Sequence, residues 1–250
     1  MNEYTKYLSE VESSLLAIAG VKPGHNNAEA QRYINTKLDV IGISTPVVRN
    51  LARQGFSFSN IELQEQLLTW DHIWKTSAVH DAKTQAYFFV ELNYSKFEQK
   101  KLWEVIRHWV KQVDNWAHSD SLSKIYTRIL EAEEEIVYSQ LVKWNRSKEL
   151  WERRQSLVAC LYYAKTKKKH LSYEKIISLV EPLLSDKAYY VQKGIGWTLR
   201  ELRQAHTAKA DRFISKNLGM ISPVAFTAAI EHLGKEEKEQ LKQKRKSMRR

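Results

Sequence analysis

The sequence contains few of the residues that cross-link or interrupt a chain. Its 250 residues include one cysteine, four prolines and eight glycines. A single cysteine, Cys160, excludes a disulfide framework and indicates a reducing compartment, and its apolar neighbours predict a buried small residue. The scarcity of proline and glycine leaves no obvious linker between domains. Together with the few β-branched runs, it argues against a conventional α/β enzyme.

Several motifs that carry chemistry are also missing. There is no glycine-rich phosphate loop, since GIGW at 194–197 lacks the lysine and the turn, and there is no serine nucleophile elbow. The eight histidines include no metal-binding i, i+4 pair, and we interpret His80 and His118 as helix-surface residues. We therefore expect neither a metal site nor a cofactor.

Long apolar runs are absent as well. No segment approaches the roughly 18 uninterrupted apolar residues that a membrane-spanning helix needs, and no secretion signal precedes the first expected helix. We expect a cytosolic protein without a membrane-spanning segment.

Basic residues, by contrast, are in excess. The chain has 40 Lys and Arg against 29 Asp and Glu, a formal charge of +11. A surface of this charge attracts polyanions over about 8 to 10 Å at ordinary salt. Nucleic acid is the first class of partner to consider and an anionic membrane surface is the second; of the two we expect nucleic acid, and no membrane partner.

The abundant Leu, Ala, Glu, Lys and Gln favour helices nearly throughout. Apolar spacing and end signals predict helices at 3–19, 28–41, 47–53, 60–74, 78–93, 96–112, 116–131, 134–145, 149–165, 172–184, 188–205, 208–217 and 222–232.

The later helices form pairs that repeat. Aligning His118, Ser156 and Gly194 gives a period of roughly 38 residues, typical of two-helix repeats of the HEAT and armadillo kind. We predict an all-α fold, a right-handed α-solenoid of HEAT-like repeats with a concave basic DNA-binding face. Residues 1–234 would form a single domain.

Two basic segments lie outside the predicted helices. Residues 235–250 would be a frayed helix or a disordered tail, which either adds phosphate affinity or is only solvated. The loop Lys165–His170 has the same two interpretations.

The segment VDNWAHSD, 113–120, is the candidate site. Trp116 and Asp120 lie four residues apart at a helix start, so they share one face. An acid on a basic face lowers DNA affinity, so it either pairs with a base such as Arg154 or stabilises a cation that forms during a reaction. Other tryptophans, namely Trp103, Trp109, Trp144 and Trp151, are interpreted as packing residues.

Four segments in this order resemble the bacterial AlkD-type alkylpurine DNA glycosylases, over about residues 4 to 233. They are QRYINTKLDVIGISTP at 31–46, WAHSD at 116–120, LWERR at 150–154 and VQKGIGWTLRE at 191–201. The chain departs from the family in Ala117-His118-Ser119, where the family has more acids, and in the basic tail.

The resemblance implies a role for each matching position. Asp120 would be the catalytic aspartate, and Trp116 and Trp197 would contact the lesion. Tyr33, Arg154 and Arg200 would contact DNA. The implied activity is removal of N3- and N7-alkylpurines, such as 3-methyladenine and 7-methylguanine, from double-stranded DNA by a monomer. The resemblance also implies that the base need not be flipped into a pocket, and that the protein lies in the bacterial cytosol, associated with the nucleoid when it is bound to DNA.

Two other classes of function remain open from the residues. A noncatalytic helical-repeat protein would bind structured DNA or a protein partner without releasing a base. An RNA- or ribosome-associated scaffold is disfavoured, because no recognisable motif reads single-stranded bases.

Overall fold

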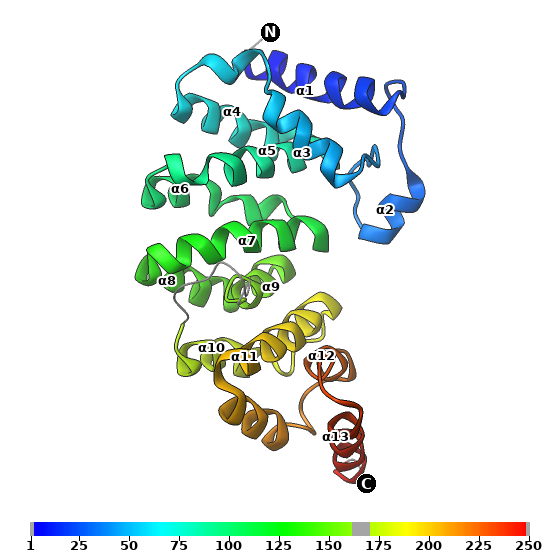
Figure 1. Cartoon of the computed structure of the whole chain (residues 1–250), viewed down its shortest axis with the longest axis vertical. Helices are drawn as coiled ribbons and strands as arrows, with labels where there is room; N and C mark the ends of the chain where they lie inside the picture. The colour runs from blue at the N-terminus through cyan, green and yellow to red at the C-terminus, as the bar shows by residue number, and fades with distance from the viewer. Residues whose placement is uncertain (1–2, 162–170, 249–250) are drawn as a thin grey trace. The chain divides into compact units, whose positions relative to one another are not determined.

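Every regular element in the described part of the chain is a helix. The computed structural model describes residues 3–161 and 171–248, so the predicted basic loop Lys165–His170 lies outside the described residues. The all-α prediction is confirmed, and within the described ranges the only β feature is an isolated bridge between Asp39 and Val79. The α-helices (Figure 1) are α1 (Glu3–Ala19), α2 (Ala28–Ile34), α3 (Thr45–Gln54), α4 (Leu63–Thr76), α5 (His80–Asn93), α6 (Gln99–Ile106), α7 (Trp116–Ala132), α8 (Glu134–Asn145), α9 (Leu150–Val158), α10 (Tyr173–Val180), α11 (Tyr189–Lys216), α12 (Pro223–Ala229) and α13 (Lys235–Ser247).

Four short 3-10 helices occur among the described residues. They are η1 (Ser57–Asn60), η2 (Tyr94–Lys96), η3 (Trp109–Gln112) and η4 (Glu181–Leu183). The predicted helix at 96–112 therefore divides into α6 and η3, because the α-helix ends at Ile106.

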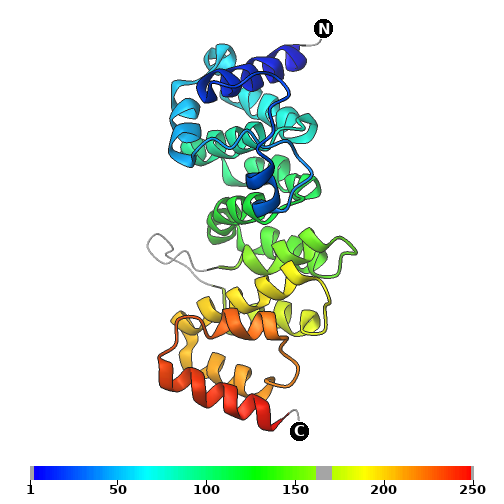
Figure 2. The same ribbon diagram turned by 90° about the vertical axis from the view of Figure 1, so that its right-hand side faces the viewer.

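The chain divides into two compact units, unit 1 (Met1–Ile125) and unit 2 (Tyr126–Arg250). In unit 1, α5 packs against α3 and α4, and nine of its fourteen residues are buried. In unit 2, α9 packs against α8 and α11, and α11 packs against α12. Figure 2 follows the chain of unit 2 from α11 to α13 in yellow to red.

These packed helix pairs are consistent with a HEAT-like repeat fold. A two-helix unit cannot bury its apolar stripe alone, so neighbouring pairs complete the core. The handedness, the concave basic face and the single domain over 1–234 stay predictions.

The predicted packing roles of the tryptophans are largely confirmed. Trp103, Trp109 and Trp144 are buried. Trp151 is half-buried and stacks on Tyr190 with ring centroids 5.0 Å apart. Cys160 is buried, as its apolar neighbours predict.

The predicted helix over 28–41 is wrong in its second half. The helix ends at Ile34, and Asn35 adopts a left-handed conformation with φ of 56°. Beyond it, the N–H of Val40 donates to Asn26 Oδ1 at 2.9 Å, and the N–H of Ile41 donates to Asp81 Oδ2 at 2.8 Å. Distant side chains thus satisfy donors that a helix would have satisfied locally.

The basic tail is a helix over most of its length. Residues 235–247 form α13, and its Arg245 is buried within unit 2. Arg245 donates from Nη2 to the carbonyl of Ile221 at 2.5 Å, and its guanidinium lies 4.5 Å from the Phe226 ring. A cation over an aromatic face is attracted to it, so α13 has a defined anchor.

No helix in the described ranges is both long and apolar enough to cross a bilayer.

Candidate functional site

Tyr33 and Trp116 meet in unit 1, although 83 residues of sequence separate them. Their rings are edge to face, with centroids 5.5 Å apart and planes inclined by 84°. The indole Nε1–H of Trp116 donates to the carbonyl of Tyr33 at 3.3 Å. Tyr33 is 74% exposed and Trp116 is half-buried, so the pair presents aromatic surface to solvent.

Asp114 holds these two segments together. Its Oδ1 accepts a hydrogen bond from Thr36 Oγ1 at 2.6 Å, and its Oδ2 accepts one from the N–H of Lys37 at 2.7 Å. Asp114 lies two residues before Trp116, and Thr36 lies three residues after Tyr33. Hydrogen bonds to an ionised acceptor are stronger than neutral ones, so this clamp fixes the loop after α2 against the start of α7.

Asn115 caps α7, which begins at its predicted position, Trp116. The Oδ1 of Asn115 accepts from the N–H of His118 at 2.8 Å, which is an N-cap hydrogen bond. The helix then runs from Trp116 to Ala132. Asp120 is half-buried one turn beyond Trp116, and the i, i+4 spacing places both on one side of α7.

The interpretation of His118 as a helix-surface residue is wrong. Its side chain is 1% exposed and stacks on His80, with centroids 4.1 Å apart. The Nδ1 atom faces the amide nitrogen of Asn115 at 3.1 Å, and Nε2 faces the carbonyl of His80 at 3.2 Å. Because a carbonyl only accepts, the hydrogen of the neutral ring is on Nε2.

His80, Lys83 and His118 form a cluster in which burial lowers the pKa of both imidazoles. Burial lowers the pKa of His118 well below 6.5, with smaller contributions from the neighbouring His80 and Lys83. Burial also lowers the pKa of Lys83 to about 8, and its ammonium donates to the carbonyl of Trp74. The sequence contained no local signal for this cluster, because α4, α5 and α7 each contribute to it.

In unit 2, Trp197 and Arg200 lie on α11. The Arg200 guanidinium is 6.0 Å from the Trp197 ring centroid. Arg200 also contacts two carboxylates: its Nε lies 3.1 Å from Glu201 Oε1, and its Nη1 contacts Glu231 Oε2. Arg200, which is predicted to contact DNA, thus has two carboxylates of the protein as counter-ions.

Arg154 is placed differently from Arg200. Its side chain is 3% exposed, and Nη1 donates to the carbonyl of Tyr190 at 2.8 Å. A Cβ built on Gly194 would lie 3.6 Å from Arg154 Cγ, so the stem of the arginine packs against α11. Arg154 therefore joins α9 to α11, a contact that the LWERR motif alone did not reveal.

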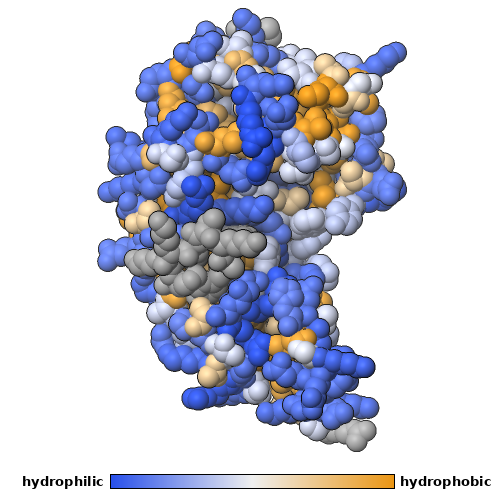
Figure 3. Space-filling view, in the orientation of Figure 1, coloured by the Kyte–Doolittle hydropathy of each residue, from blue (hydrophilic) through white to orange (hydrophobic). Residues whose placement is uncertain are grey.

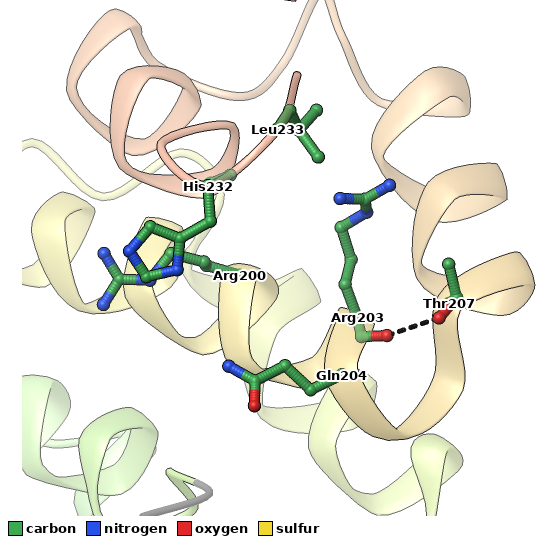
Figure 4. Close-up of a pocket in the computed structure, with 7 residues that line it drawn as sticks. Arg200, Arg203, Gln204, Thr207, His232 and Leu233 are labelled. Atoms are coloured by element: carbon green, nitrogen blue, oxygen red, sulfur yellow. Dashed lines mark hydrogen bonds between the residues drawn. The ribbon is translucent and has the colours of Figure 1, made fainter. Parts of the chain in front are cut away.

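A pocket of about 240 Å³ opens beside Arg200. Figure 4 shows Arg200 and His232 on one side of it, with Arg203, Gln204 and Thr207 arranged along α11. Arg203 also forms ion pairs, with Asp211 and Glu237. The sequence motifs indicated neither the pocket nor His232.

The six predicted site residues therefore fall into two groups. Tyr33, Trp116 and Asp120 belong to unit 1, while Arg154, Trp197 and Arg200 belong to unit 2. Their convergence on one face stays a prediction. The space-filling view shows polar surface over most of the visible face, with apolar side chains gathered near α1 and α3 (Figure 3).

Metal-ligating side chains do not cluster in the part of the chain that the structure describes. Its His, Cys, Asp and Glu side chains form no group of three or more that could hold an ion.

Comparison with known proteins identifies the family. A comparison with the curated proteins finds no match. Among solved structures, the chain is similar to a "Predicted DNA alkylation repair enzyme from Enterococcus faecalis", with a TM-score of 0.71 and 16% sequence identity over 86% of this chain and 97% of that chain. At this identity the likeness concerns the fold. Residues 18–233 match the family model described as DNA alkylation repair enzyme, and the chain therefore belongs to that family.

Proposed function

We propose that this protein is a monofunctional DNA glycosylase that removes positively charged N3- and N7-alkylpurines from double-stranded DNA. The observation that carries the proposal is the exposed Tyr33–Trp116 pair with Asp120 one helical turn away, in a chain of the DNA alkylation repair enzyme family. The aromatic pair offers surface to a nucleoside, and the carboxylate offers a negative charge beside it. We further propose that the protein acts as a monomer in the bacterial cytosol.

The charge of the substrate determines what the site must supply. An N3- or N7-alkylpurine carries a positive ring, so the base leaves with the bonding electron pair as a neutral molecule and needs no general acid. The sugar then becomes an oxocarbenium-like cation at C1′. Water adds to C1′ and gives up a proton, which leaves an abasic site and the free base.

Asp120 is the group proposed to stabilise that cation. A fixed carboxylate lowers the energy of a developing positive charge more than that of the ground state, and it can also orient the attacking water. Removing one well-placed electrostatic group typically costs about 10² to 10³ in rate. Trp116 and Trp197 would contact the cationic nucleoside, each contributing about 0.5 to 2 kcal/mol.

Tyr33, Arg154 and Arg200 are proposed as DNA contacts. The excess of 40 Lys and Arg over 29 Asp and Glu supports binding to a phosphate backbone. Arg200 is the more accessible arginine, with 17% of its side chain exposed. Arg154 would reach a phosphate only if its buried guanidinium became exposed on binding.

Release of 7-methylguanine from methylated duplex DNA tests the proposal. The wild-type protein should release the base, and Asp120→Asn should reduce the single-turnover rate about 10² to 10³-fold. Asp39→Asn is a matched control, because Asp39 is exposed in the same unit and the substitution removes the same charge. It should retain wild-type activity.

Two outcomes would contradict the proposal. Wild-type protein that binds duplex DNA without releasing a base would indicate the noncatalytic helical-repeat alternative. Equal rates for Asp120→Asn and the wild type would show that the catalytic assignment is wrong even if the glycosylase activity is real.

A further inference from the structure

The two carboxylates that contact Arg200 differ in how firmly they are held. Glu201 has a side chain only 10% exposed, and it accepts a second hydrogen bond from Gln204 Nε2 at 2.8 Å. Glu231 has a side chain 60% exposed. It lies two residues beyond the end of α12, outside any helix. Glu201 is therefore a fixed partner of Arg200, whereas Glu231 can move away at low cost.

An exposed ion pair of this kind is weak. Pairs with a solvent-exposed partner contribute about 0 to 1 kcal/mol, and here water solvates the Glu231 carboxylate well. The pair forms only part of the environment of Arg200, which is also one of the residues that line the pocket shown in Figure 4.

A phosphate is a better partner for Arg200 than Glu231. The contact of Glu231 with Arg200 joins Oε2 to Nη1, whereas a guanidinium can bind two oxygens of one phosphate, and the phosphates of a duplex are presented in a regular array. Glu231, left beside a bound phosphate, would instead repel it. Glu231 therefore competes with a phosphate for Arg200, and it also repels a phosphate that approaches.

We propose that Glu231 is a counter-ion that limits the affinity of the protein for undamaged duplex DNA, because a backbone phosphate must displace it from Arg200. The inference rests on the proposed function in one respect, the assignment of Arg200 to a DNA phosphate. Weak general affinity is useful to a protein that must search DNA, because contacts at the lesion then make a larger difference to residence time.

Fluorescence anisotropy with an undamaged duplex at fixed salt tests this role. Glu231→Gln should bind about three- to tenfold more tightly than the wild type, which corresponds to removing an exposed ion pair and one repulsive charge. Glu236→Gln is the matched control, because it makes the same charge change at an exposed position on the nearby α13. It should change the affinity less than twofold.

A double-mutant cycle then assigns the effect to Arg200. In an Arg200→Gln background, Glu231→Gln should no longer tighten binding. Equal effects of Glu231→Gln and Glu236→Gln would overturn the inference, because net charge alone would explain them. Tightening that persists without Arg200 would overturn it as well.

The measurement is independent of base release. If the wild type releases no 7-methylguanine but Glu231→Gln tightens binding in an Arg200-dependent way, the glycosylase proposal fails and the counter-ion role stands. If base release occurs and the Glu231 variant binds like the Glu236 control, only the counter-ion role fails.

Discussion

Among single residues, His118 shows most clearly how burial changes chemistry near the candidate site. The neutral ring lies in the first turn of α7, between the side chain of Asn115 and the carbonyl of His80. Its folded-state pKa lies below the ordinary value of 6.5, so between these two pKa values the unfolded chain binds more protons than the folded protein. Stability contributed by the neutral ring is present above about pH 6.5 and decreases as the pH falls.

We predict that this residue makes unit 1 sensitive to mild acid. Between about pH 7.5 and pH 5, the unfolding free energy of the wild type should fall by up to about 1.4 kcal/mol per pH unit for each such histidine. His118→Gln should be less stable at pH 7.5 but should lose less on acidification, as urea denaturation at each pH would show. His25→Gln, at an exposed position, is the control. Parallel pH profiles for the wild type and His118→Gln would refute the assignment.

For the elements, the contact between α11 and α12 depends on a glycine. A Cβ on Gly196 would meet the carbonyl oxygen of Ala225 at 2.3 Å and the Cβ of Ala228 at 2.7 Å, both closer than real contacts allow. Gly194 lies two residues earlier on the same helix, where a Cβ would find only ordinary contacts of 3.5 Å or more. The lack of a side chain at Gly196 thus sets how closely α12 approaches the Trp197–Arg200 segment.

This difference predicts opposite effects of one substitution at two positions. Gly196→Ala should destabilise the protein by about 1 to 3 kcal/mol, because α12 must move away. Gly194→Ala should be neutral or stabilising by up to about 1 kcal/mol, since alanine favours a helix interior. Thermal unfolding of both variants measures the contrast. Similar melting temperatures for the two would show that the close approach has no energetic importance.

The charge of the whole molecule bears on binding rather than on the fold. The formal charge of +11 includes α13, which lies beyond the residues that match the family. Arg245 anchors this helix, and Lys242, Lys244 and Lys246 are exposed on it. Cations on an anchored helix, such as Lys242 and Lys246 four residues apart on one face, can contact phosphates at a defined place, whereas those of a solvated tail cannot.

We predict that replacing these three lysines by glutamine weakens binding to undamaged duplex. The slope of log affinity against log salt should become shallower by about 0.9 for each phosphate that the variant no longer neutralises. The rate of base release at saturating protein should stay the same. Replacement of Lys96, Lys100 and Lys101, three exposed lysines of unit 1, lowers the net charge equally and serves as the control. Equal weakening by both triple variants would indicate that α13 contributes only net charge.

Local features of the sequence were sufficient for the fold class and for part of the candidate site. Helix propensity and apolar spacing predicted the helices, and the structure confirms a start of α7 at Trp116, where Asn115 caps the helix. These features were readable because the side chains on one helix face repeat every three to four residues. The positions of Trp116 and Asp120 on one face follow from that spacing alone.

The tertiary structure decided what depends on distant partners. The segment after α2 is a loop rather than the predicted helix, because its backbone N–H groups donate hydrogen bonds to Asp81 and Asp114. These two carboxylates lie in distant parts of the sequence. The same applies to the burial of His118 and to the contact of Arg200 with Glu231, 31 residues away. A hydrogen bond or ion pair between remote residues leaves no periodic trace in the sequence, because only folding brings the two groups together.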